Sequence, residues 1–108
     1  MTDKIVVLCT CASEDEALAI ARQLVEKRLA ACGNLVRGVR SIYRWQGNVE
    51  DSEEVLLVIK SRRPLFDALR KAVAAAHSYQ VPEIIALPVI DGAPSYLDWI
   101  DAETSPPA

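Results

Sequence analysis

The residues best suited to bind a metal ion are three cysteines and one histidine: Cys9, Cys11, Cys32 and His77. Cys9 and Cys11 are two positions apart in an apolar, β-branched segment, so their thiols share one face of a strand. Two thiolates on one face can bind a soft ion such as Cu(I). A buried cysteine also behaves as a small apolar side chain, and no Cys-x-x-Cys spacing indicates a closed zinc site. Both interpretations of the pair remain open.

His77 lies in the polar segment His77–Pro82, where an imidazole can bind a metal or cap the loop. Because histidine titrates near neutral pH, ligand binding there would depend on pH. One histidine cannot complete a tetrahedral site unless copies of it meet around a trimer axis or a neighbouring chain supplies a cysteine. A purely structural role in the loop is the alternative.

The sequence contains no motif of the common enzyme classes. There is no Ser-His-Asp set and no His-Glu-x-x-His, and 4 glycines leave few positions for a phosphate-binding loop. An acid–base pair drawn from His77 and Glu83 would specify no reaction. We therefore expect a protein that is not an enzyme.

Composition and charge predict a single domain, residues 1–108, that binds neither nucleic acid nor a membrane. The chain is 51% apolar and 25% charged, which is ordinary for one globular domain. No Lys or Arg follows Lys71, so the C-terminal third lacks groups that neutralise phosphates. The early apolar run Ile5–Leu8 is too short for a signal core or a membrane span. Because the number of cysteines is odd and no export signal is visible, we expect reduced thiols and a cytoplasmic location.

Hydrophobic periodicity predicts the elements that must position these residues. In chain order they are a strand over Lys4–Thr10, a helix capped by Ser13 and ending near Cys32–Gly33, a strand over Asn34–Gln46, a turn at Gly47–Asn48, a strand over Glu54–Lys60, a helix opened by Pro64, a strand over Glu83–Ile90, a short helix over Pro94–Ile100 and a tail over about 103–108. The strand over Glu54–Lys60 is apolar on both faces, so we expect it at the centre of the sheet. Pro88 requires a sheet edge, a bulge or a break in pairing. The order β-α-β-β-α-β with an extra C-terminal helix predicts an α+β, ferredoxin-like antiparallel sheet.

Four separated blocks of sequence give the chain a resemblance that periodicity alone does not. They are Leu29-Ala30-Ala31-Cys32, Ser41-Ile42-Tyr43-Arg44-Trp45, Val81-Pro82-Glu83-Ile84-Ile85-Ala86-Leu87-Pro88 and Tyr96-Leu97-Asp98-Trp99-Ile100. In this order and spacing they resemble the signature blocks of the CutA divalent-cation tolerance family, from about residue 4 to residue 102. The loop departs from the family pattern, since Ser78 stands where proline is usual and Gln80 where an acid is usual. Arg37 also replaces a common proline, and Gln46 a common glutamate.

The resemblance implies a tight homotrimer whose long hairpin reaches neighbouring subunits, and a link to tolerance of copper and other divalent cations. Cys32 matches the cysteine of the family. We therefore expect a non-enzymatic, metal-responsive trimer that binds copper or another divalent metal weakly, with no obligatory cofactor. The candidate metal ligands are Cys9, Cys32 and His77.

The resemblance also implies a cleft between subunits, lined by Tyr43, Trp45, Lys60, Tyr79 and Glu83. An ammonium, a carboxylate and aromatic rings in one cleft can hold a small polar anion. A second hypothesis is therefore a trimeric small-molecule sensor or signalling protein. Aromatic residues are also favoured at plain protein–protein interfaces, so interface packing is the alternative for Trp45.

Overall fold

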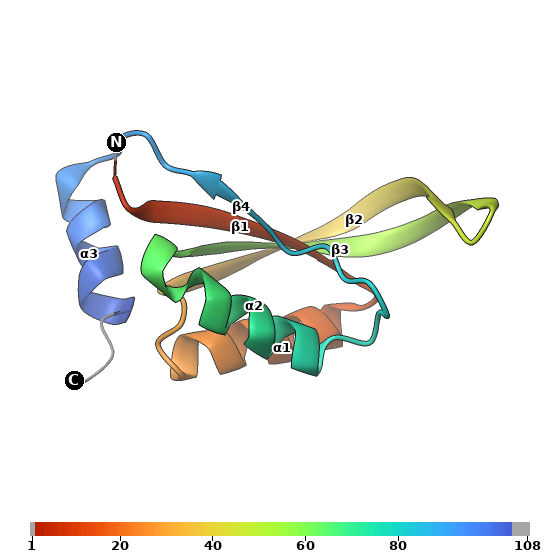
Figure 1. Ribbon diagram of the computed structural model, residues 1–108, viewed down its shortest axis with the longest axis horizontal. Helices are drawn as coiled ribbons and strands as arrows, with labels where there is room; N and C mark the ends of the chain where they lie inside the picture. Colours follow the sequence, from red (N-terminus) through yellow and green to blue (C-terminus); the bar gives the residue numbers. More distant parts are fainter. Residues whose placement is uncertain (1, 105–108) are drawn as a thin grey trace.

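The computed structural model describes residues 2–104 and contains one sheet with three α-helices (Figure 1). The elements are β1 (Lys4–Cys11), α1 (Glu14–Glu26), β2 (Cys32–Trp45), β3 (Asn48–Arg62), a 3₁₀ turn (Arg63–Leu65), α2 (Phe66–Ala76), β4 (Ile85–Pro88) and α3 (Pro94–Thr104). The sheet order is β2-β3-β1-β4 and every neighbouring pair is antiparallel. This is the predicted α+β, ferredoxin-like arrangement, with β3 inside the sheet and β4 at its edge.

Helices α1 and α2 lie side by side on one face of the sheet, which leaves the other face open (Figure 1). Alternate residues of each strand point to opposite faces. The helix-facing residues of the two central strands form the core with the helices: Ile5, Val7, Cys9, Cys11, Val55, Leu57 and Ile59. The open face is also apolar, with Val6, Leu8, Val36, Leu56, Val58, Ile85 and Leu87. In the isolated chain Ile85 is 50% and Leu87 48% exposed.

Helix α1 ends at Glu26, six residues before the predicted end at Cys32. The helix is capped by Lys27, and Arg28 then adopts a left-handed backbone with φ of 59°. The Leu29 N–H closes this turn on the Leu24 carbonyl at 2.9 Å. Sequence patterning missed this end because a left-handed residue after a helix is usually glycine, and arginine stands here. Cys32 consequently begins β2 instead of ending a helix.

Strands β2 and β3 form a hairpin that projects beyond the helices (Figure 1). Its turn is Gln46–Gly47, both with positive φ, as a two-residue type I′ turn requires. Strand β3 therefore begins at Asn48, six residues before the predicted start. A β-bulge between Val36 and Val39 shifts the register of β2, with Gly38 at φ of 70°.

The C-terminal elements also differ in length from the prediction. Strand β4 is shorter and pairs only with β1, where Pro88 lies opposite Ile5 at the edge of the sheet. Helix α3 continues four residues past Ile100, so Glu103 and Thr104 belong to it and not to a tail. Residues 105–108 lie outside the described residues. No helix in the described range is long and apolar enough to cross a membrane.

Helix α3 is held at one end of the sheet by polar contacts. Lys4, buried at 7% exposure, pairs with Asp3 at 2.6 Å and with Asp101 of α3 at 3.0 Å. The guanidinium of Arg62 donates to the Thr104 hydroxyl at 3.0 Å. These contacts fix the C-terminal helix at the end of the sheet opposite the hairpin tip.

Candidate functional site

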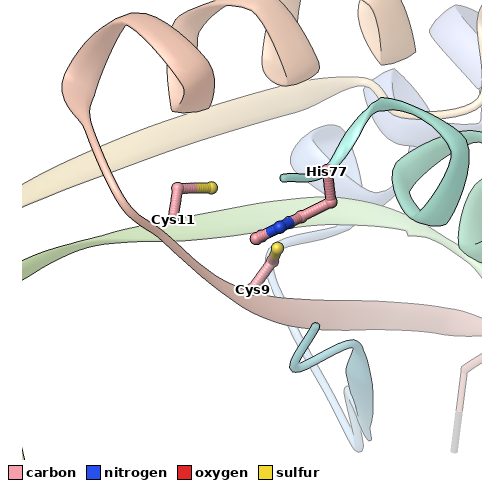
Figure 2. Close-up of side chains that lie close together, drawn as sticks. All are labelled: Cys9, Cys11 and His77. Carbon is pink, nitrogen blue, oxygen red and sulfur yellow. The ribbon is translucent and has the colours of Figure 1, made fainter. Parts of the chain in front are cut away.

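Two thiols and an imidazole converge beneath the sheet, between β1 and the end of α2 (Figure 2). Cys9 and Cys11 lie on the helix-facing side of β1, as their two-residue spacing predicts, and both are fully buried. Their Sγ atoms and a ring nitrogen of His77 all lie within 4.8 Å of one another. The three side chains form the one such group of potential metal ligands in residues 2–104.

His77 caps the C-terminus of α2, and its side chain is 0% exposed. Its Nδ1 accepts a 3.0 Å hydrogen bond from the Tyr79 N–H, and Nε2 lies 2.8 Å from the Thr10 carbonyl oxygen. Because Nδ1 is an acceptor, the proton of a neutral ring sits on Nε2 and is donated to Thr10. The histidine is therefore tied to β1 on one side and to its own loop on the other. Glu16 lies nearby, with its carboxylate 3.9 Å from Nδ1.

The two thiols interact with each other. A hydrogen bond with Cys9 lowers the pKa of Cys11, against burial and the nearby Glu16 and Glu54, which raise it. The same hydrogen bond, together with burial, raises the pKa of Cys9. A thiolate at Cys11 is thus stabilised by the proton that Cys9 retains.

Cys32, the third predicted metal ligand, lies on the open face of the sheet. It pairs in register with Lys60 of β3, and its thiol is 3.5 Å from the amide oxygen of Asn34. The ammonium of Lys60 donates to the same amide oxygen. Since the cluster of Cys9, Cys11 and His77 lies on the helix-facing side, one chain cannot bring Cys32 to it. All three cysteines are free.

Four of the five predicted cleft residues meet in a depression of about 650 Å³ on the open face. Tyr43 and Trp45 come from β2, and Tyr79 and Glu83 from the segment between α2 and β4. The fifth, Lys60, does not line it. The full lining is Thr10, Ser41, Ile42, Tyr43, Trp45, Glu54, Ser78, Tyr79, Gln80, Val81 and Glu83.

Glu54 is the charged cleft residue that sequence reasoning missed. Its carboxylate accepts a 2.6 Å hydrogen bond from the Tyr79 hydroxyl, and the residue is only 5% exposed. Burial and this hydrogen bond raise the pKa of Tyr79, so its hydroxyl stays protonated as a donor. A glutamate directly before the apolar run Val55–Ile59 is a signal of a buried carboxylate, because that position lies at the border of the apolar part of the strand. Patterning predicts this residue only as the start of the strand and assigns it to no site.

Comparison with known proteins gives the family. Residues 5–103 match the family model described as CutA1 divalent ion tolerance protein. The chain belongs to this family. It is 52% identical over 99 residues to the divalent-cation tolerance protein CutA of Thermus thermophilus, covering 92% of this chain and 96% of that protein. It is also 50% identical to Protein CutA of Mus musculus, covering 88% of this chain but only 54% of the mouse protein.

Solved structures of CutA1-family proteins share the fold. A CutA structure from Xylella fastidiosa matches with a TM-score of 0.94 at 39% identity, covering 96% of this chain and 100% of that one. The Thermus thermophilus structure matches with a TM-score of 0.92 at 50% identity, covering 94% and 99%. Relatives carry different location names, since one from Arabidopsis thaliana is called chloroplastic and a structure from Archaeoglobus fulgidus is called periplasmic. The names of these relatives therefore assign no common compartment to the family.

Proposed function

We propose that this CutA1-family protein responds to metal ions by binding a soft cation, Cu(I) in the first place, at Cys9, Cys11 and His77. The observation that carries the proposal is the convergence of two sulfurs and a ring nitrogen within 4.8 Å. Sulfur ligands select Cu(I), and imidazole suits copper and zinc. Three ligands held at about 2.0–2.3 Å from one ion in a trigonal plane lie about 3.5–4 Å from one another, so a small contraction of the cluster suffices.

The hydrogen bonds of His77 support a role as a ligand. Metal-bound histidines commonly donate their second ring N–H to a carbonyl, which fixes the tautomer. The Thr10 carbonyl is in place to accept that proton from Nε2. To bind the ion, Nδ1 would have to give up the hydrogen bond that it accepts from the Tyr79 N–H. The loss of this hydrogen bond would make binding of the ion weak. A bound ion would neutralise deprotonated thiols and link β1 to the loop after α2.

The burial of the cluster supports binding and not catalysis. Cys9 and Cys11 are fully buried, so a substrate cannot reach the thiols in this conformation. An ion would enter when the segment 77–82 opens, and residues 78, 80 and 81 of that segment are exposed. Free buried thiols also suit a reducing compartment, and we place the protein in the cytoplasm on that basis.

Anaerobic titration with Cu(I) against a competing chelator tests the metal proposal, with Zn(II) and Cu(II) titrated in parallel. We expect one Cu(I) per chain in the wild type and loss of this binding in Cys11→Ala. Cys32→Ala is the matched control and should bind normally, because Cys32 lies on the other face of the sheet. Retained binding in Cys11→Ala together with loss in Cys32→Ala would assign the metal to a different set of ligands.

We further propose that the working assembly is a homotrimer. The open face carries exposed Ile85 and Leu87, and the hairpin beyond the helices exposes Ile42 and Val49 at 69% and 64%. Apolar surface and unpaired strand edges of this extent require cover, and a second copy of the chain is the natural one. The likeness to CutA1 structures fits this assembly.

A second candidate function is the binding of a small molecule in the cleft of Tyr43, Trp45, Glu54, Tyr79 and Glu83. The specific observation in its favour is a depression of about 650 Å³, a volume typical of ligand sites, lined by rings and carboxylates from separate elements. A fluorescence screen of metabolites tests it, because Trp45 lines the cleft and reports occupancy.

A further inference from the structure

Within one chain the cleft is acidic, and Lys60, which the resemblance places in a cleft between subunits, is not among its lining residues. With Lys60 the site would hold an anion, but Lys60 is six residues from Glu54 along β3, or about 20 Å. Instead, Glu54 and Glu83 both line the cleft. None of its lining residues, all of them within residues 2–104, is Lys, Arg or His. An anion entering the cleft would therefore meet two carboxylates.

Glu54 is a buried carboxylate with no cation beside it. Its described partner is the Tyr79 hydroxyl at 2.6 Å, and no ion pair of the described residues includes it. A buried charge without a countercharge is costly, so a positive ligand would be favoured there. The nearby arginines Arg37 and Arg40 are already paired, with Glu14 at 2.6 Å and with Asp51 at 2.8 Å. Among residues 2–104 no ion pair supplies a positive charge to Glu54, so a ligand or a second copy of the chain is the natural source of one.

The cleft does not suit a bare metal ion. Among residues 2–104, Glu54 and Glu83 have no third metal-ligating side chain close to both of them. Hard divalent ions take six or more oxygen ligands. The cleft instead offers three aromatic rings, those of Tyr43, Trp45 and Tyr79. Aromatic faces attract organic cations and pack against their methylene groups.

We propose that the cleft binds a small organic cation, an alkylammonium or guanidinium compound, with Glu54 and Glu83 as countercharges and the three rings as its walls. The proposal rests on the ligand-binding function proposed above and names the chemical class of the ligand. The volume of about 650 Å³ admits a molecule much larger than a hydrated ion.

Three probes of equal carbon length test the charge preference: butane-1,4-diamine, butane-1,4-diol and succinate. Tetramethylammonium is the fourth probe and isolates attraction to the rings. Each is titrated at low salt into the full chain carrying Trp99→Phe, which leaves Trp45 as the single tryptophan. Isothermal calorimetry on the unmodified protein gives the affinities. We expect the diamine and tetramethylammonium to bind and to change Trp45 fluorescence, and the diol and succinate not to bind.

Charge-neutral variants locate the binding. Glu54→Gln keeps an acceptor for the Tyr79 hydroxyl and should weaken diamine binding about tenfold or more, the effect of losing a charged hydrogen bond. Glu53→Gln removes the same charge one residue away, next to Arg40 and Asp51 and outside the cleft, and should leave the affinity unchanged. A circular dichroism melt of each variant shows that it is folded.

The other outcomes overturn the inference in distinguishable ways. Succinate binding with a Trp45 response would keep the cleft as a ligand site but reject the cation. No response to any probe would reject both the cation and the ligand-binding function of the cleft. Equal losses in Glu54→Gln and Glu53→Gln would mean non-specific charge attraction. Tighter diamine binding in Lys60→Met would show that a lysine of a second copy fills the cleft, and would also reject a free cation.

Discussion

The backbone N–H of Tyr79 donates to Nδ1 of His77 at 3.0 Å, and the two rings lie 4.7 Å apart. His77 belongs to the buried thiol cluster, whereas the hydroxyl end of Tyr79 lines the cleft on the open face. The segment that follows α2 therefore connects both candidate sites through two residues.

Loading the cluster with Cu(I) is expected to expose the amide of Tyr79. If the ion takes Nδ1 of His77, the Tyr79 N–H loses its acceptor and its hydrogen exchange accelerates. Hydrogen–deuterium exchange with and without Cu(I) measures this. The same comparison in Cys11→Ala should show no change, and unaltered exchange in a loaded wild type would exclude Nδ1 as the ligand.

Thiol labelling of the native protein is expected to modify Cys32 and neither of the other cysteines. Cys9 and Cys11 are fully buried, and Cys32 is partly exposed on the open face. Intact mass after a short reaction should show at most one adduct per chain, against three after denaturation. Rapid appearance of a second adduct would mean that β1 opens far more readily than its burial indicates.

Removing the Tyr79 hydroxyl is expected to destabilise the fold. Tyr79→Phe leaves the Glu54 carboxylate buried without its donor, which costs about 1–3 kcal/mol. Tyr43→Phe is the control, since its hydroxyl lies 3.3 Å from Ser52 in an exposed pair and should contribute little. Urea denaturation of both variants gives the free energies of unfolding. Equal stability of the two would show that Glu54 is hydrated through the cleft.

Acid should weaken the fold partly through Glu16. Burial raises the pKa of Glu16, but the hydrogen bonds from Ser78 and from the Ala12 N–H together lower it by more than burial raises it. The pKa therefore lies below its usual value. A depressed carboxyl pKa stabilises the fold above the unfolded pKa of about 4.3, and this contribution is lost as pH falls through the folded pKa. Stability curves between about pH 6 and 3 should be flatter for Glu16→Gln than for the exposed control Glu26→Gln. Curves of equal slope would remove Glu16 from the acid response.

The chain is expected to sediment as a trimer that persists on dilution. Sedimentation equilibrium at micromolar concentration should give three times the chain mass of 11.8 kDa. Leu87→Glu, on the open face, should favour the monomer because it places a charge in the buried contact. A monomeric wild type would leave the apolar open face without an explanation.

Patterning predicted the order of strands and helices because the core residues alternate or recur at helical spacing. Patterning did not predict where individual strands and helices begin and end, because turns and hairpins set those boundaries. The residues Asn48–Glu53 of β3 are polar except for Val49, since both faces of the projecting hairpin are exposed in one chain, so no apolar alternation marks them as a strand.

The site could be predicted only in part for a similar reason. The spacing of Cys9 and Cys11 fixed their common face, but which helix end would meet them depends on tertiary packing. Lys60 was assigned to the cleft by resemblance, whereas strand rise separates it from Glu54 by about 20 Å. Period-two alternation places both residues on the same face, and only their six-residue separation along the strand reveals how far apart they lie.

The pairing of β1 with β3 has a consequence for synthesis. Residues 4–11 pair with residues 55–62, so β1 leaves the ribosome roughly fifty residues before its central partner exists. The β2–β3 hairpin needs only its two-residue turn and can zip as soon as it emerges. The nascent chain therefore carries the apolar, cysteine-bearing β1 without its central partner for about half of its translation, and that strand is where chaperone contact and premature thiol oxidation would concentrate.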